Sequence, residues 1–174
     1  MNRIKRQSSL LSLRIILLIS VIIPSCDKVN KDTLYIGTWQ HKDVVDTGDL
    51  VFNTTRTLIL TRTTYEEIYM LQRYNSDVVL SIIGFKGELS VKGTEMTFSL
   101  MEIGTCVKDA SQNCTDQVIF HGRGTQYYND NIQYFRLTIK GEYEADENVL
   151  QLKRDTNGDG DMEDNGESIE FQRI

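Results

Sequence analysis

GELSVKGTEMTFSL, residues 87–100, is the stretch that indicates the fold most directly. Its apolar side chains occupy every second position on either side of a turn at Lys92-Gly93: Leu89, Val91, Met96, Phe98 and Leu100. An apolar period of two is typical of a strand with one buried face, whereas a helix would show a period of 3.6. The stretch therefore predicts an antiparallel hairpin.

A second hairpin of the same kind follows later in the chain. Residues 141–152, GEYEADENVLQL, repeat the pattern at a constant offset of 54 residues, with turn residues Asp146, Glu147 and Asn148. Two similar hairpins favour an up-and-down meander over a Greek-key sandwich.

The same alternation recurs along most of the chain, and no segment shows a convincing helical period. Its apolar positions include Leu58, Leu60, Ile68, Met70, Phe135, Leu137, Ile139, Ile169 and Phe171. We predict an all-β antiparallel meander that closes into an eight- to ten-stranded barrel, with a β-sandwich as the alternative. Large side chains expected to point inward would fill a small barrel: Met70, Met96, Phe98, Phe135 and Phe171.

The N-terminal segment has the pattern of a secretory signal. Residues 2–14 hold four basic residues and no acidic one, and residues 15–23 are apolar apart from Ser20. This run of nine residues is too short for a membrane span, which needs about 20 apolar residues. We therefore expect residues 1–25 to be removed.

Ile23-Pro24-Ser25-Cys26 resembles the bacterial lipobox. The resemblance implies cleavage before Cys26 and acylation of that residue, which would anchor the chain to a membrane. Residues 26–33 would then be a tether and residues 34–174 a single domain in the bacterial cell envelope, at the outer membrane or surface rather than the inner membrane. The alternative is an ordinary secretory signal with Cys26 free.

Charge and cysteine content fit an extracytoplasmic protein. Without residues 1–25 the chain has 15 basic and 25 acidic residues, a net charge of about −10, which argues against a nucleic-acid partner. With Cys26 acylated, Cys106 and Cys114 form an even pair across a short polar loop, and in an oxidising compartment we expect a disulfide between them. Two reduced thiols are the alternative.

Gly37-Thr38-Trp39, which contains the only tryptophan, precedes the alternating hairpins. This combination resembles the lipocalin-like bacterial lipoproteins. The resemblance implies a lipocalin-like barrel in which an arginine from late in the chain packs over Trp39. Arg173 is the candidate for this arginine, because it stands at an alternate position from Ile169 and Phe171 and would therefore point to the same inner face of the strand.

Residues 155–167, here called the acidic loop, contain the sharpest chemical motif. Oxygen-bearing side chains at alternate positions before Gly160 match the first half of a calcium loop, although the closing acidic residue comes one position late. The candidate ligands are Asp155, Asn157, Asp159, Asp161, Glu163 and Glu167. A structural Ca²⁺ is one expectation, and a solvated acidic loop is the other.

No catalytic motif stands out, because His41 and His121 lie in neither zinc-ligand nor nucleophile spacing. We therefore do not expect an enzyme. The sequence favours either a barrel that binds a small apolar or amphipathic ligand or a surface interaction module, such as an adhesin or inhibitor, with a filled barrel. An enclosed apolar cavity of roughly 300 Å³ or more would favour the ligand carrier.

Overall fold

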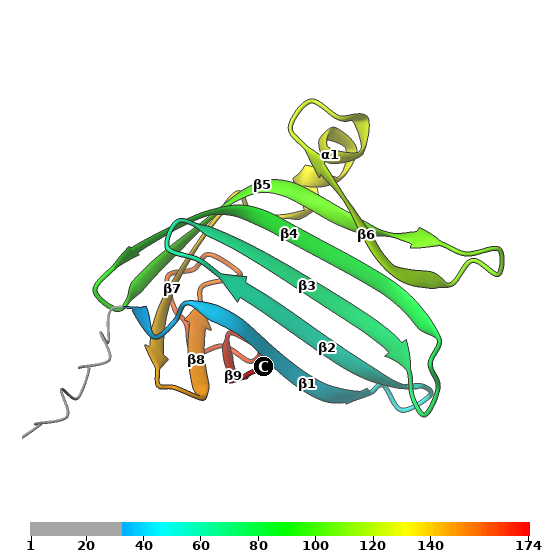
Figure 1. The fold of residues 1–174 in the computed structure, drawn as a ribbon, viewed down its shortest axis with the longest axis horizontal. Helices are drawn as coiled ribbons and strands as arrows, with labels where there is room; N and C mark the ends of the chain where they lie inside the picture. Colours follow the sequence, from blue (N-terminus) through cyan, green and yellow to red (C-terminus); the bar gives the residue numbers. More distant parts are fainter. Residues whose placement is uncertain (1–32) are drawn as a thin grey trace, which may run out of the picture.

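The computed structural model describes residues 33–174, and nine antiparallel strands follow one another along them (Figure 1). A short helix, α1 (Gln126–Asn131), and a 3₁₀ turn, η2 (Ile132–Tyr134), separate the sixth strand from the seventh. The strands are β1 (Gly37–Asp46), β2 (Val51–Leu60), β3 (Thr64–Arg73), β4 (Val79–Lys92), β5 (Glu95–Lys108), β6 (Cys114–Gly122), β7 (Thr138–Ala145), β8 (Val149–Arg154) and β9 (Ser168–Arg173). The predicted all-β antiparallel meander is confirmed.

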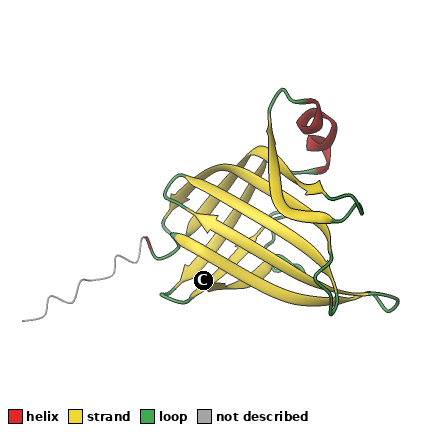
Figure 2. Ribbon diagram, turned by 45° about the vertical axis from the view of Figure 1, so that its right-hand side comes forward, coloured by secondary structure: helices red, strands yellow, loops and turns green. Residues whose placement is uncertain are grey.

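The nine strands are hydrogen-bonded in a ring, but the ring is not even. Its order is β1-β2-β3-β4-β6-β5-β7-β8-β9, with further pairing between β4 and β5. It closes through two residue pairs between β1 and β9, Trp39↔Arg173 and Gln40↔Gln172. Because β4 and β5 span 14 residues and β8 and β9 only six, the long strands continue past the closed part as an open, curved sheet (Figures 1 and 2).

The closed part of the ring is filled with apolar side chains. Its most deeply buried members come from β1, β2, β5, β8 and β9: Trp39, Leu58, Leu60, Met96, Phe98, Leu150, Leu152 and Phe171. They occupy the alternate positions that the sequence pattern assigns to a buried face. The hydrophobic core thus lies at one end of the molecule.

The internal repeat is also structural. Gly87 faces Leu100 across the β4–β5 hairpin, and Gly141 faces Arg154 across the β7–β8 hairpin, again 54 residues later. A Cβ at Gly87 would overlap the carbonyl oxygen of Ser99, and one at Gly141 would overlap that of Lys153. Both hairpins therefore begin with a glycine because the facing backbone comes too close for any side chain.

The predicted strand through Phe135 and Leu137 is wrong in its first half, because β7 begins only at Thr138. Phe135 and Leu137 lie in the loop that follows η2. Earlier in this connection is α1, whose N-terminus is capped by the Thr125 hydroxyl accepting from the backbone N–H of Tyr128. Six residues are too few to show a helical period. Tyr128 packs with Leu100, while Phe135 is only half-buried.

The predicted inward position of Met70 is also wrong. β3 pairs with β2 in the register Leu58↔Glu67, which places Glu67 on the inner face and Met70 on the outer face. Met70 instead packs with Ile82 and the cysteine pair outside the ring. Met96, Phe98 and Phe171 point inward and are buried as predicted.

Candidate functional site

Three charged side chains, Arg56, Glu67 and Arg154, meet inside the ring, and we call them the triad. Arg154 donates two parallel hydrogen bonds to Glu67, from Nη1 to Oε2 at 2.8 Å and from Nη2 to Oε1 at 3.0 Å. Arg56 donates through Nε to the same Oε1. Glu67 and Arg154 are each 4% exposed, so this is a desolvated ion pair with a second arginine beside it.

Burial and charge act in opposite directions on the triad. Burial alone would raise the pKa of Glu67, but the charges of Arg154 and Arg56 and their hydrogen bonds outweigh it and hold that pKa at about 2. Burial, together with repulsion by Arg154, lowers the pKa of Arg56. One carboxylate therefore compensates two guanidinium groups, and a positive charge is left over.

A pocket of about 100 Å³ opens beside the triad. Its walls are mostly aromatic and aliphatic, with a third arginine, Arg136, among them. The lining residues are Arg56, Tyr65, Glu67, Phe85, Phe98, Leu100, Phe135, Arg136, Ile139, Arg154 and Thr156. We call this the triad pocket. It combines apolar walls with three guanidinium groups and one carboxylate.

An apolar row continues from the triad pocket across the open part of the sheet. Arg56 pairs with Tyr69, Tyr69 with Ile83, Ile83 with Thr105, and Thr105 with Ile119. All lie on the face that carries Glu67 and Phe85, because side chains alternate along each strand. Tyr69 and Ile83 are each 37% exposed and Ile119 is 46% exposed. The inner face of the open sheet thus presents apolar surface.

The predicted contact between Arg173 and Trp39 is present at the closed end. The Arg173 guanidinium carbon lies 4.0 Å from the centroid of the Trp39 ring and its nitrogens donate to the carbonyl oxygens of Leu34, Ile36 and Glu147. The indole N–H of Trp39 donates to Tyr35 O at 2.7 Å. A Cβ at Gly37 would overlap Arg173, so glycine leaves room for the arginine.

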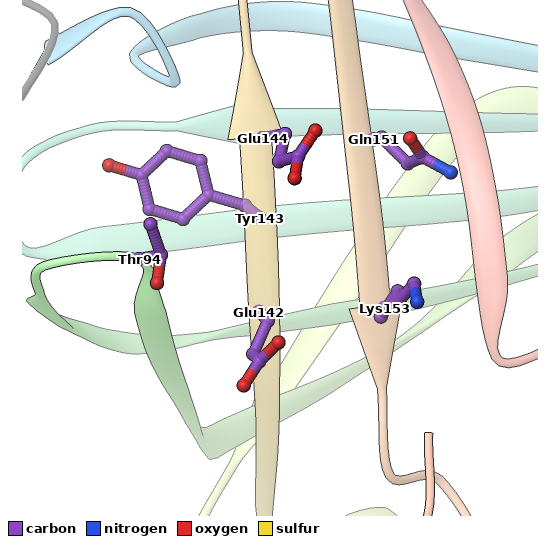
Figure 3. Close-up of a pocket in the computed structure, with 6 residues that line it drawn as sticks. All are labelled: Thr94, Glu142, Tyr143, Glu144, Gln151 and Lys153. Atoms are coloured by element: carbon purple, nitrogen blue, oxygen red, sulfur yellow. The ribbon is translucent and has the colours of Figure 1, made fainter. Parts of the chain in front are cut away.

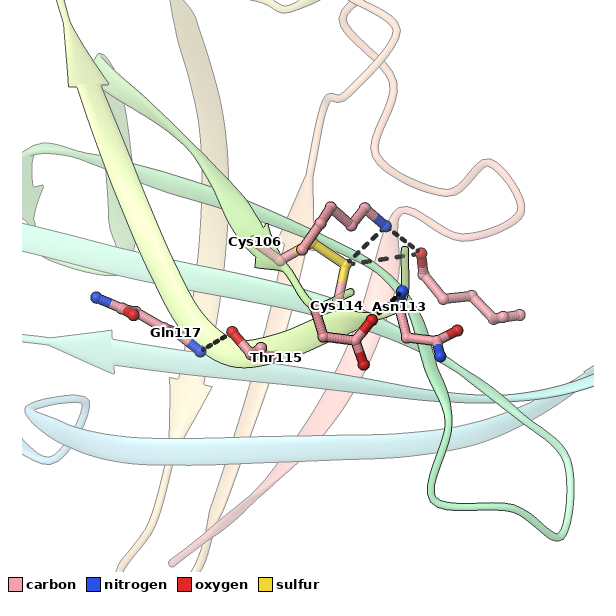
Figure 4. The surroundings of a disulfide bond; sticks show 8 residues. Cys106, Asn113, Cys114, Thr115 and Gln117 are labelled. Atoms are coloured by element: carbon pink, nitrogen blue, oxygen red, sulfur yellow. Dashed lines mark hydrogen bonds between the residues drawn. A yellow bond between two sulfur atoms is a disulfide. The ribbon is translucent and has the colours of Figure 1, made fainter. Parts of the chain in front are cut away.

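Cys106 and Cys114 form the predicted disulfide, with their Cα atoms 5.4 Å apart (Figure 4). It joins the end of β5 to the start of β6. Lys108 crosses it, donating from Nζ to the sulfur of Cys114 and to Leu80 O. The bond lies on the outer face of the sheet, against Ile82.

The acidic loop connects β8 to β9, and its carboxylates are held mainly by its own backbone. Asp155 accepts from the N–H groups of Gly158 and Gly160, Asp159 from Asp161, and Asp161 from Glu163, while Asn157 accepts from Asp159 and donates to Asp159 and Asp164. Glu163 points toward Lys153, 3.8 Å away. Within residues 33–174, no group of three or more His, Cys, Asp or Glu side chains is arranged to hold a metal ion.

Glu167 is the exception among the candidate ligands in the acidic loop. It is 3% exposed, and its Oε1 accepts from the backbone N–H groups of Thr156 and Asn157 and from the Thr156 hydroxyl. Its Oε2 is buried and has no hydrogen-bond partner among the described residues. A buried, unsatisfied carboxylate oxygen at the end of the loop is an energetically costly feature.

The remaining residues singled out in the sequence are Cys26 and the two histidines. Cys26 lies outside the described residues. The Nδ1 of His41 donates a hydrogen bond to the backbone carbonyl oxygen of Glu170 at 2.8 Å, and the His121 ring lies against the Tyr127 ring. No helix among residues 33–174 is both long and apolar enough to cross a membrane.

A surface pocket of about 270 Å³ lies over β7 and β8 (Figure 3). Glu142 and Glu144 come from β7 and Gln151 and Lys153 from β8, with Thr94 and Tyr143 completing the lining. These residues include neither a histidine nor a nucleophile beside a base. The pocket is a polar depression on the outside of the sheet.

Sequence reasoning missed the triad. Glu67 and Arg154 are 87 residues apart, and each looks like an ordinary polar residue in an alternating strand. One signal was available in the sequence. Glu67 is two positions after Tyr65, so the two side chains lie on the same face of the strand, and a buried Tyr65 implies that Glu67 also points inward.

Comparison with protein-family models, with curated proteins and with solved structures finds no match to this chain.

Proposed function

We propose that this chain is a lipid-anchored protein of the bacterial cell envelope whose lipocalin-like barrel binds a small apolar or amphipathic molecule on its open side. The observation that carries the proposal is the continuity between the triad pocket and the apolar row of Tyr69, Ile83 and Ile119. A concave apolar surface next to a few polar groups is the usual character of a small-molecule site.

The triad pocket is too small to enclose a whole ligand. At about 100 Å³ it is smaller than the roughly 300 Å³ typical of an enclosed ligand cavity. A bound molecule would therefore be only partly enclosed and would lie along the open sheet.

The lipocalin-like character is supported by the arrangement of Gly37, Trp39 and Arg173, and the anchor is supported by the lipobox-like residues 23–26.

Native mass spectrometry of the protein released from its own envelope tests the ligand-binding function. We expect a retained small molecule in the wild-type protein and its loss in Ile83→Lys, which places a charge in the apolar row. Val44→Lys is the matched control, because Val44 is exposed and lies on the opposite face of β1 from Trp39. A wild-type protein with no bound small molecule would contradict the proposal.

A surface interaction module is the second candidate, favoured by the filled closed part of the ring. The exposed apolar row would then contact a protein partner. The same measurement separates the two: a stoichiometric protein partner, without a small molecule, supports the interaction module.

We also propose a structural Ca²⁺ in the acidic loop, closed by Glu167. The spacing of Asp155, Asn157 and Asp159 before Gly160 fits such a loop, and the unpartnered Oε2 of Glu167 would gain a partner. The side chains that now accept from the loop backbone would have to turn toward the ion.

Thermal unfolding tests the calcium proposal. Binding only the folded state would add about 2.7 kcal/mol at a hundredfold excess over Kd. Millimolar Ca²⁺ should raise the Tm of chelator-treated protein, and Asp159→Ala should abolish the response while Asp116→Ala, an exposed control outside the loop, keeps it. Equal Tm values with Ca²⁺ and with chelator would leave a solvated acidic loop.

Membrane partitioning tests the anchor. Cys26→Ala should release the protein into the aqueous phase of a detergent extraction, because the acyl chains are lost. Continued partitioning of the variant into detergent would show that another feature holds the chain to membranes.

A further inference from the structure

We infer that the triad pocket binds the anionic head group of a small amphipathic molecule, through Arg56 and Arg136. This inference rests on the proposed ligand-binding function and names the chemical class of its ligand. Its starting point is the charge of the pocket lining, which has three arginines and one glutamate in a chain whose net charge is −6. This local excess of positive charge would attract an anionic group.

The guanidinium groups leave hydrogen-bond donors free for that anion. Arg56 uses only its Nε toward Glu67, and its two Nη groups donate to no described residue. Arg136 is exposed and forms no ion pair or hydrogen bond within residues 33–174. Guanidinium donors are arranged in a planar fork that matches a carboxylate.

The acidic loop lies against one of these arginines but forms no ion pair with either of them among the described residues. None of its carboxylates is ion-paired with Arg56 or Arg136, and Glu167 accepts from the loop's own Thr156 and Asn157 instead. The loop does contact Arg136, because a Cβ at Gly158 would overlap its guanidinium group. The cation is therefore packed against a glycine at the edge of the pocket.

The shape of the site decides how such a ligand would lie. A pocket of about 100 Å³ has room for about three water molecules, which suits a carboxylate-sized head group and little more. The apolar remainder of the molecule would then cover the exposed side chains of Tyr69, Ile83 and Ile119, which continue from Arg56 across the sheet.

Calorimetric titration with three probes of equal chain length tests the inference. The full chain is prepared with Cys26→Ala, so that no acyl group competes, and is titrated with octanoate, octanol and octyltrimethylammonium. We expect octanoate to bind at least tenfold more tightly than octanol, and Arg136→Gln to weaken octanoate binding about tenfold without affecting octanol, since one charge-assisted hydrogen bond is lost. Arg62→Gln, an exposed arginine in the β2–β3 turn, is the matched control.

Two outcomes would overturn the inference in different ways. If octanol binds as tightly as octanoate, or if Arg136→Gln leaves octanoate binding unchanged, the anion preference is wrong but ligand binding stands. If none of the three probes binds, the inference of an anionic head group is also wrong. The native mass spectra of the envelope protein then decide, separately, whether the protein binds any small molecule.

Discussion

Replacing Glu67 by Gln should destabilise the protein far more than an ordinary surface substitution. The variant keeps the shape of the side chain but removes the one negative charge between Arg56 and Arg154, both of which donate to it. The amide can also accept through only one of its two terminal atoms, so one Arg154 hydrogen bond is replaced by a contact between two donors. Removing one partner of a buried ion pair costs about 3 to 5 kcal/mol, and we expect a loss in that range.

The pH dependence provides an independent estimate of the same interaction. The pKa of Glu67 is about 2 in the folded protein against an ordinary value of 4.5. Because the folded-state pKa is depressed, the stabilisation is fully present above 4.5 and is lost as the pH falls from there through about 2. The difference corresponds to roughly 3 kcal/mol, since one pKa unit is worth about 1.4 kcal/mol.

Urea unfolding followed by the fluorescence of Trp39 measures both quantities, because Trp39 is the only tryptophan and is fully buried. The gap in unfolding free energy between wild type and Glu67→Gln should be about 3 to 5 kcal/mol at pH 7 and should shrink between pH 5 and pH 2. Glu88→Gln, an exposed control on β4, should unfold like the wild type. A gap below about 1 kcal/mol at pH 7, or one that does not change with pH, would refute the reasoning.

Three further changes test other parts of the fold by the same unfolding assay. Replacing both Cys106 and Cys114 by Ser should cost roughly 2 to 3 kcal/mol, because the disulfide closes only a short loop; an unchanged stability would mean that it constrains little. Gly87→Ala should cost about 3 kcal/mol, since the new Cβ meets the Ser99 carbonyl oxygen, whereas Gly122→Ala, whose Cβ would lie 3.7 Å from the nearest neighbouring atom, should change stability by less than about 0.5 kcal/mol. Equal effects of the two substitutions would contradict the close-approach explanation. Arg173→Gln should cost at least about 2 kcal/mol, because it removes the cation over Trp39 together with the guanidinium hydrogen bonds to backbone carbonyl oxygens, and a neutral result would show that these contacts are incidental.

The sequence by itself determined the local features of this protein. Alternation through Leu89, Val91, Met96 and Phe98 predicts strands because a pleated strand turns every second side chain to the same face. The offset of 54 residues between Gly87 and Gly141 predicted two equivalent hairpins, and the structure gives both glycines the same close backbone contact. The cysteine pair and the contact of Trp39 with Arg173 were also predictable, the first from spacing and the second from a family resemblance with a parity argument.

Only the tertiary structure decided which face of β3 is buried. Ile68 and Met70 on one face and Tyr65 and Glu67 on the other are both plausible inward sets, and alternation alone does not choose between them. Pairing with Leu58 places Glu67 inside, where Arg154 compensates it from 87 residues away. Strand period is a property of neighbouring residues, whereas register and charge compensation depend on segments that meet only after folding. For the same reason the exposed row beyond the triad pocket and the uneven closure of the ring had no signature in the sequence, and the triad itself had only the shared face of Tyr65 and Glu67.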